Sequence, residues 1–188
     1  MSRPTTTEVS DRALVLYALS RRGTIEFVVS ESGGEPSRLA QAERARLEAE
    51  QWLERESVAP ALREDERTLM DAESWSWPSE AIADAMWRKE ALGVLLWALE
   101  HVADLPPYGE EFQQQSVDEA ITRYGSVDAF RANGHLRPDD QIEQAWMESD
   151  AWFGATEGRQ GDDANMASIA AERFRALSWL RDRDAAPA

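Results

Sequence analysis

The chain has 188 residues, of which 43% are hydrophobic and 30% charged, a composition that suits one folded domain with a buried core and argues against disorder. Its formal net charge is −16, from 36 acidic and 20 basic residues, so we expect no binding to nucleic acid or to an anionic membrane, whereas a basic protein would be a fitting partner. The absence of cysteine excludes disulfides, thiolate metal sites and cysteine nucleophiles.

The sequence shows no pattern of a secreted or membrane protein. Its N-terminal stretch, MSRPTTTEVSDR, lacks the apolar core of a signal peptide. The longest apolar run, at 91–99, is about half the length needed to cross a bilayer. We therefore expect a cytoplasmic protein, with flexible ends at 1–4 and 184–188.

The first predicted element is a helix that begins near Thr5. Glu8 follows at capping-box spacing, in which each side chain accepts the other residue's backbone N–H. Residues 23–32 either extend this helix or form a short strand, and we favour the helix because no partner strand is visible. The pair Gly33 and Gly34 ends the element.

A second helix is predicted from Pro36, because proline is favoured in the first turn of a helix. Its apolar residues are scattered among many arginines and glutamates, which is typical of an exposed amphipathic helix with one buried face. Pro60 interrupts the pattern. A short helical turn is expected to hold Leu62, Leu69 and Met70, and the stretch ESWSWPSE forms the loop to the next helix.

The central predicted helix covers residues 79–103. Ser79 is a favourable N-cap, and the pair Pro106 and Pro107 stops the helix. Every residue from 91 to 99 is apolar or glycine, so this part of the helix has no polar face. We expect it to be the axis of the core.

Three further helices are predicted after the central one. The stretch SVDE at 116–119 has capping-box spacing, Ser126 starts another short helix, and Pro138 opens a longer one. A polar, glycine-rich loop at 154–165 then leads to the last helix, which is expected to end near residue 183.

The predicted fold class is all-α. No stretch shows a convincing alternation of apolar and polar residues, and no internal repeat appears. We therefore expect a single domain over residues 1–188, an orthogonal helical bundle of roughly six to eight helices around the buried central helix.

Negative charge is concentrated in an acidic connecting segment, residues 105–163. This segment holds 13 acidic and 4 basic residues, more than half of the chain's excess. It is either a charged recognition surface or a solvated connector between the central and last helices.

The head of the central helix carries the candidate site. Arg88 and Glu90 lie on faces that become fully apolar one turn later, so their charged groups are expected at the edge of the core, where each needs a partner. We expect Asp84 to pair with Arg88, and Arg173 to pair with Glu90. A further member of the set is expected to be Glu172 or Arg12.

Two interpretations of this cluster remain open. It is either an ion-pair network that fixes how the first, central and last helices cross, or a polar pocket. In the pocket interpretation, Arg88 or Arg173 holds an anionic ligand. The walls of such a pocket would be Trp87, Trp97 and Trp179.

No catalytic, metal or cofactor site is predicted. His101 and His135 are far apart and lack the helical spacing of zinc or di-iron ligands. The stretch GDDAN at 161–165 lacks the spaced oxygen ligands of an EF-hand. Ser178 lies inside a predicted helix rather than at a nucleophile elbow, and no glycine pair is followed by the Lys-Ser/Thr of a phosphate-binding loop.

Three stretches together resemble a bacterial protein family. They are DRALVLYALSRRGTIEF, MWRKEALGVLLWALEHVADLPPY and SIAAERFRALSWL, and LRPDDQIEQA resembles a further piece. In this order they are similar to domain-of-unknown-function family 4272, over most of the chain. The resemblance implies a single helical domain and carries no assigned activity. Phe174 and Ser178 depart from the family pattern, which commonly has His and Asn at these places.

Two functional hypotheses follow. The first is a non-enzymatic, acidic, helical protein-binding module, of which an immunity or inhibitor protein for a basic toxin or nuclease is one concrete form. The second is a small-molecule-binding or enzymatic domain that uses the Arg/Glu/Trp pocket between the first, central and last helices. No oligomeric state is predicted.

Overall fold

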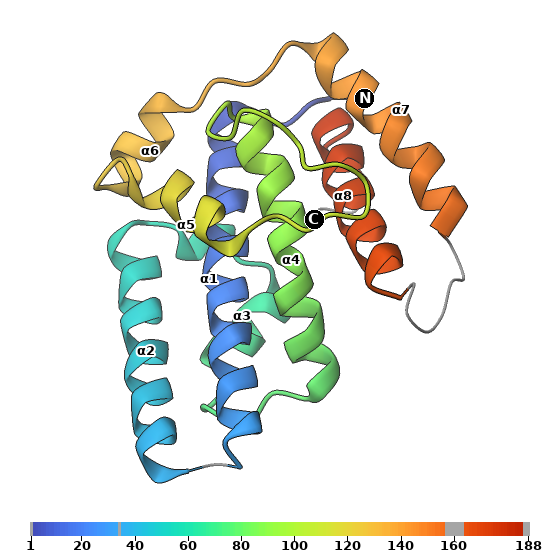
Figure 1. The fold of residues 1–188 in the computed structure, drawn as a ribbon. Coiled ribbons are helices and arrows are strands. Elements are labelled where there is room, and N and C mark those ends of the chain that lie inside the picture. Colours follow the sequence, from blue (N-terminus) through green and yellow to red (C-terminus); the bar gives the residue numbers. More distant parts are fainter. Residues whose placement is uncertain (1, 34, 157–163, 186–188) are drawn as a thin grey trace. The chain divides into compact units, whose positions relative to one another are not determined.

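The computed structural model describes residues 2–33, 35–156 and 164–185, and Figure 1 shows that its regular elements are helices. No strand occurs among these residues, so the all-α prediction is confirmed. The chain divides into two compact units, a first unit of residues 1–13 and 89–188 and a second unit of residues 14–88. The elements are α1 (Thr6–Glu31), α2 (Pro36–Arg55), the 3-10 turn η1 (Ala59–Ala61), α3 (Glu64–Asp71), α4 (Ser79–Ala98), α5 (Gln114–Thr122), α6 (Val127–Asn133), α7 (Asp139–Thr156) and α8 (Ala164–Arg181).

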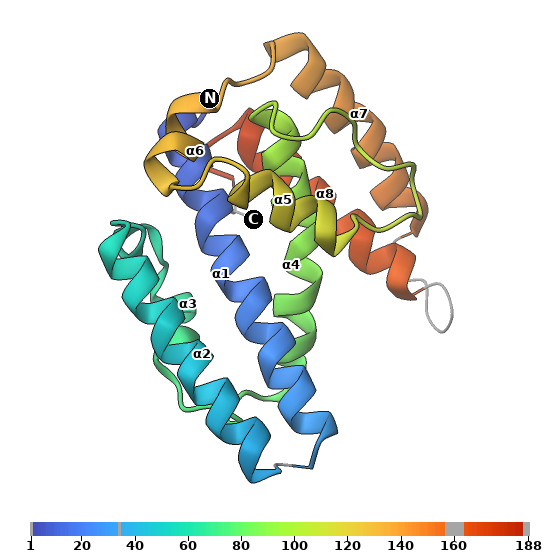
Figure 2. The same ribbon diagram turned by 60° about the vertical axis from the view of Figure 1, so that its left-hand side comes forward.

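The second unit packs α2 and α3 with the later part of α1 and the earlier part of α4. Helix α2 returns alongside α1 in the opposite direction (Figures 1 and 2), and the Tyr17 ring meets the Trp52 ring at a centroid distance of 6.3 Å. Where α1 meets α4, a Cβ on Gly23 would lie 2.7 Å from the Cβ of Ala85. A side chain at Gly23 would therefore prevent the observed approach of the two helices.

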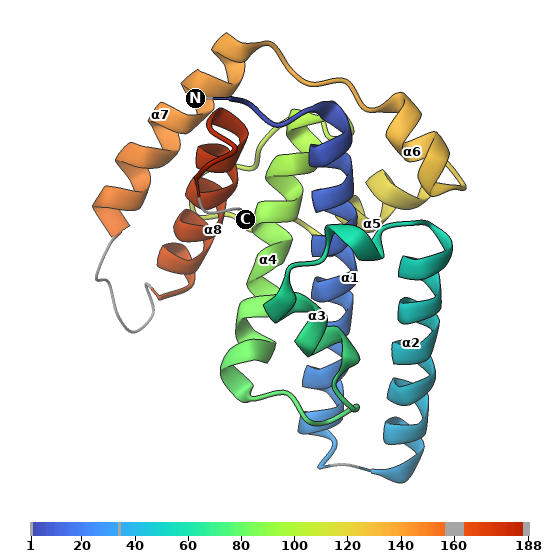
Figure 3. The same cartoon turned by 180° about the vertical axis from the view of Figure 1, so that it is seen from behind.

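The first unit contains the apolar end of α4 together with α5 to α8. Leu92, Leu95 and Leu96 are completely buried, as expected for the axis of a core. Helices α7 and α8 lie side by side (Figure 3), with Phe153 stacked on Phe174 at 4.9 Å between ring centroids. In this unit α8 and α4 supply the buried faces, and α7 covers α8.

The start of α1 follows the predicted capping box. The backbone N–H of Thr5 donates to the Glu8 carboxylate at 2.7 Å, and the N–H of Glu8 donates to the Thr5 hydroxyl at 3.3 Å. The hydrogen bond from Thr5 also lowers the pKa of Glu8 below its usual value. Residues 23–31 continue this helix, so the helical alternative to a strand is confirmed.

Two predicted helix boundaries are wrong. The central helix ends at Ala98 rather than near residue 103, because Glu100 takes a left-handed φ of 61° and the N–H of His101 donates to the carbonyl of Leu96 at 2.8 Å. Ser116 does not cap a helix, since α5 already begins at Gln114. By contrast, Ser126 caps α6, as predicted, by accepting the N–H of Ala129 at 3.1 Å.

The acidic connecting segment contains three helices, α5 to α7, within its described part. Residues 157–163, and with them most of the GDDAN stretch, lie outside the described residues. No helix in the described part of the chain combines the length and apolarity needed to span a membrane.

Substitution of Gly23 tests the contact between α1 and α4 in the second unit, and Gly154 of the first unit provides the control. Gly23→Ala should lower the free energy of unfolding by about 1–2 kcal/mol, because the added methyl group collides with Ala85 and this outweighs the gain in helix propensity. Gly154→Ala, in α7, meets nothing within 4 Å and should raise it by up to about 1 kcal/mol. Urea denaturation measures the free energy of unfolding of both variants. Equal changes in Gly23→Ala and Gly154→Ala would contradict the close approach of α1 and α4 at Gly23.

Candidate functional site

Three glutamates are completely buried in the described part of the chain: Glu26, Glu66 and Glu90. A buried carboxylate is costly unless hydrogen bonds and an opposite charge replace its water. Each of the three carboxylates accepts one backbone N–H and also contacts a guanidinium group. These three carboxylates are therefore the candidate centres of a functional site.

Glu90, in the first unit, pairs with Arg173 of α8. The Nε and Nη2 groups of Arg173 donate to one carboxylate oxygen of Glu90 at 3.0 and 2.8 Å, and the N–H of Phe112 donates to the other at 2.9 Å. Arg173 also donates to the carbonyl groups of Pro106 and Glu110 at 2.9 and 2.5 Å. The cluster thus ties α4, α8 and the loop between α4 and α5 together.

The charged groups of this cluster mostly contact one another and the nearby backbone. Burial raises the pKa of Glu90, whereas the charge of Arg173 and the hydrogen bonds from Arg173 and Phe112 oppose that rise. These contacts occupy four of the five N–H groups of Arg173. Because its charge is matched by Glu90, Arg173 offers little net attraction to an anionic ligand.

A cavity of about 180 Å³ lies beside Arg173. The hydroxyl of Ser149, which is 1% exposed, lines it and has no hydrogen-bond partner among the described residues. Burial, and then the charge of Glu148, raise the pKa of the neighbouring Tyr108. The cavity is smaller than the roughly 300 Å³ at which ligand pockets usually begin.

Arg88 belongs to the second unit and has a partner that the sequence did not indicate. Its Nη1 group donates to the Glu66 carboxylate at 2.6 Å, and Glu66 also accepts the backbone N–H of Arg63 at 3.1 Å. The expected partner, Asp84, is exposed. The predicted Arg88–Asp84 pair is therefore wrong: helical spacing allowed it, but burial places Glu66 of α3 against the guanidinium.

The predicted set is divided between the two units. Asp84, Trp87 and Arg88 belong to the second unit, and the other six residues to the first. Glu172 accepts a hydrogen bond from Arg175, and the Trp97 ring lies 4.8 Å from the guanidinium of Arg137. The remaining predicted residues are buried or half-buried in their own units: Arg12 (5% exposed), Trp179 (6% exposed) and Trp87.

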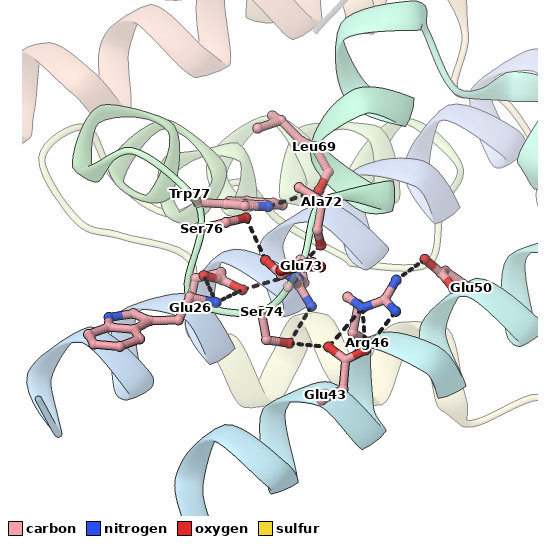
Figure 4. Close-up of polar contacts among 12 residues, drawn as sticks. Glu26, Glu43, Arg46, Glu50, Leu69, Ala72, Glu73, Ser74, Ser76 and Trp77 are labelled. Carbon is pink, nitrogen blue, oxygen red and sulfur yellow. Dashed lines mark hydrogen bonds and ion pairs between the residues drawn. The ribbon is translucent and has the colours of Figure 1, made fainter. Parts of the chain in front are cut away.

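Sequence reasoning missed a polar network in the second unit, shown in Figure 4. Arg22 and Glu26 of α1 are joined at 2.7 Å, and both side chains are 0% exposed. Arg22 also donates to the carbonyl of Ala72 at 3.1 Å and to the hydroxyl of Ser74 at 3.4 Å. Ser74 in turn donates to Glu43 of α2 at 2.8 Å. The network fixes the loop between α3 and α4 on α1 and α2.

Electrostatics in this network follow from burial and close contact. Desolvation lowers the pKa of Arg22, although the Glu26 charge opposes that shift. Hydrogen bonds from Arg46 and Ser74 lower the pKa of Glu43 to about 2. A sequence signal did exist, because Arg22 and Glu26 occupy the apolar stripe of α1 that also includes Leu19 and Val29.

The two tryptophans of the loop between α3 and α4 have opposite environments. Trp77 is 7% exposed and donates its indole N–H to the carbonyl of Leu69 at 2.8 Å. Trp75 is 52% exposed, with a left-handed φ of 66°. Its backbone N–H donates to both carboxylate oxygens of Glu26, at 2.8 and 3.1 Å.

Histidines and acids do not gather into a metal site anywhere in the described residues. His101 is 4% exposed, its Nδ1 lies 2.9 Å from the Tyr124 hydroxyl, and its ring packs on Phe130 at 4.4 Å. Burial, assisted by the charge of Arg123, lowers the pKa of His101 to about 4. His101 is therefore neutral at pH 7.

The contribution of the buried Glu90–Arg173 pair to stability can be tested by removing the charge of one partner at a time. Glu90→Gln and Arg173→Met should each lower the free energy of unfolding by about 3–5 kcal/mol, because each leaves one buried charge unmatched. The double variant Glu90→Leu/Arg173→Met should recover much of the loss. Glu143→Gln is the matched control, because Glu143 pairs with Arg181 at the surface and should cost no more than about 1 kcal/mol. Losses as small as this control in both single variants would show that the pair is not buried as described.

His101 should make the protein less stable as the pH falls. Its folded-state pKa lies below the unfolded value near 6.5, so the unfolded chain binds the proton first and stability is lost on acidification. From pH 7 to pH 5 the loss should be about 2 kcal/mol greater in the unchanged protein than in His101→Gln. His135→Gln, which removes the exposed histidine instead, is the matched control variant. A wild-type profile for His101→Gln would contradict burial of His101.

Comparison with known proteins identifies the family without supplying an activity. A search of curated proteins and a search of solved structures each found no match. A family model described as "Domain of unknown function (DUF4272)" matches residues 1–186. The predicted resemblance is thus confirmed over nearly the whole chain, and the protein belongs to the DUF4272 family.

Proposed function

We propose that this protein is a non-enzymatic helical module that binds a basic partner protein through the acidic segment of its first unit. In the described part of that segment, residues 105–156, most of the carboxylates face solvent. Asp140 and Asp150 on α7 and Glu119 on α5 are exposed. Such a surface attracts a basic protein by long-range electrostatics.

The observation that carries the proposal is the set of contacts made by the three arginines in the described part of this segment, residues 105–156. Arg137 donates to the carbonyl groups of Trp97, Val102 and Ala103. Arg123 donates to the carbonyl of His101, and Arg131 pairs with Asp11 at 2.8 Å. Each of these three guanidinium groups contacts an acceptor of the first unit. Residues 105–156 hold ten acidic residues against these three arginines, so the carboxylates dominate what an approaching molecule meets.

An immunity or inhibitor protein for a basic toxin or nuclease is one form of this function. Such a protein needs a rigid surface of strongly negative potential, because attraction between opposite charges speeds association and sets the orientation of the partner. A helical fold with its own buried ion pairs meets the requirement of rigidity. No chemical step is required of it.

The small-molecule alternative has weaker support. The Arg173 charge is matched by Glu90, and the adjoining cavity of about 180 Å³ is small for a ligand pocket. Arg88 is likewise turned to Glu66. These arginines support the interpretation as structural ion pairs within each unit more than the interpretation as ligand-binding groups.

Matched charge variants test the proposal. The protein is immobilised, proteins from the lysate of its own host are eluted by raising NaCl, and the affinity of any purified basic partner is measured. Glu119→Gln/Asp140→Asn/Asp150→Asn should weaken binding about tenfold, through the loss of three surface charges. Glu31→Gln/Glu48→Gln/Glu54→Gln removes three exposed charges from the second unit and should change affinity less than twofold.

Two results would overturn this function. One is the absence of any basic protein whose retention falls as salt rises. The other is an equal loss of affinity in the two triple variants, because binding would then follow net charge rather than the acidic segment. Circular dichroism of both variants provides the check that the helices remain folded.

A further inference from the structure

Trp75 is the one aromatic side chain in the loop between α3 and α4 that faces solvent, and it does so from an unfavourable backbone conformation. It is 52% exposed at a φ of 66°. Left-handed φ values are uncommon for residues other than glycine, asparagine and aspartate, and a bulky residue there is an outlier. Such outliers persist when their surroundings enforce them, and they cluster at functional positions.

Helix termination explains the other left-handed residues but not Trp75. Ser57 and Glu100, the other described non-glycine residues with positive φ, each stand just after a helix end. In both cases the next N–H returns to a helical carbonyl, at 2.8 Å to Leu53 after Ser57 and at 2.8 Å to Leu96 after Glu100. Trp75 lies several residues beyond the end of α3, outside any such motif.

The conformation of Trp75 is imposed from a different element. Its N–H is held by Glu26 of α1, whose carboxylate is itself completely buried against Arg22. Ala72 and Ser74, on the N-terminal side of Trp75, are bonded to the same guanidinium. The loop is therefore fixed before any partner arrives, so that binding to the Trp75 ring would require little further ordering.

Structural need does not account for the exposed ring. The neighbouring Trp77 supplies the buried anchor of this loop, by packing its ring under Arg22 and binding the carbonyl of Leu69. The group by which Trp75 binds Glu26 is its backbone N–H, which any residue other than proline could supply. Tryptophan is, however, among the residues most enriched in the energetic centres of protein interfaces.

The charge around Trp75 identifies the kind of partner. From residue 68 to residue 87 the sequence contains four acidic residues and no basic residue. All four acids are exposed, and the nearest three, Asp71, Glu73 and Glu80, flank Trp75 in the sequence. A tryptophan face in a negative field binds arginine or lysine through cation–π attraction, and repels an acidic segment.

We propose that Trp75 is the anchor of a docking surface for a cationic, arginine- or lysine-bearing segment of a partner protein. The long aliphatic stems of arginine and lysine can lie along the indole ring while their charged groups stay in water. This surface belongs to the second unit. The acidic segment belongs to the first unit, so the inference stands if the function proposed for that segment fails.

Fluorine NMR of the full chain labelled with 5-fluorotryptophan tests this inference. The resonance of Trp75 is assigned with Trp75→Phe, and the probe is a short peptide of alternating glycine and arginine, at low salt. The Trp75 resonance should shift saturably, while that of buried Trp77 stays in place. A peptide of alternating glycine and glutamate should produce no shift. An unmoved Trp75 resonance, or equal shifts with both peptides, overturns the proposal.

Trp75→Gly separates a binding role from a structural one. Glycine adopts the left-handed conformation without strain, so the urea midpoint should rise or stay unchanged while affinity for the arginine peptide falls about tenfold. Met147→Ala, at an equally exposed apolar residue of α7, should leave that affinity unchanged. A fall in the urea midpoint of Trp75→Gly, or unchanged affinity, would show that Trp75 is structural.

Discussion

The interaction on which both units depend is a buried glutamate that accepts a loop N–H and a guanidinium at the same time. In the first unit Glu90 holds Phe112 and Arg173, and in the second Glu26 holds Trp75 and Arg22. A carboxylate without water is unfavourable, so removal of either kind of partner would leave it uncompensated. The loops that follow α3 and α4 are held in place because these carboxylates require their N–H groups.

This arrangement also limits where function can lie. The buried carboxylates of Glu26, Glu66 and Glu90 are each matched by an arginine of their own unit, and charged groups that are paired in a core have little capacity left for ligands. Binding of a partner protein is therefore expected at solvent-exposed groups, namely the carboxylates of α5 to α7 and the ring of Trp75. In this account the core ion pairs provide rigidity, which lowers the entropy cost of binding, and the surface provides the contacts.

Much of the fold could be predicted from the sequence, because local signals agree with it. The Thr5–Glu8 capping box, the serine before α6 and the apolar run at 91–99 all indicate helices directly. The place of Glu90 at the edge of the apolar run predicts that it needs a partner, with Arg173 as the candidate, and the two side chains do lie together. The end of α4 was placed too late, because the left-handed turn at Glu100 carries no glycine to signal it.

The rest of the candidate site could not be predicted, because it depends on contacts between distant parts of each unit. Helical spacing made Asp84 the expected ion-pair partner of Arg88, but Arg88 instead pairs with Glu66, which lies 22 residues earlier in the sequence. Nothing in the local sequence indicates that Trp75 adopts a left-handed conformation, since its cause, Glu26, lies 49 residues earlier. The sequence did contain one signal of the second-unit network, because Arg22 and Glu26 are charged residues within the apolar stripe of α1. A charged residue in such a stripe indicates a buried charge that needs a partner.

Native-state hydrogen exchange measures the central claim most directly, at the backbone N–H groups of Phe112 and Trp75. Both residues lie in loops, where exchange is ordinarily fast. If Glu90 and Glu26 hold these groups as described, both should exchange as slowly as the core helical amides of their own units. Exchange as fast as that of the neighbouring Glu111 and Ser76 would contradict the account.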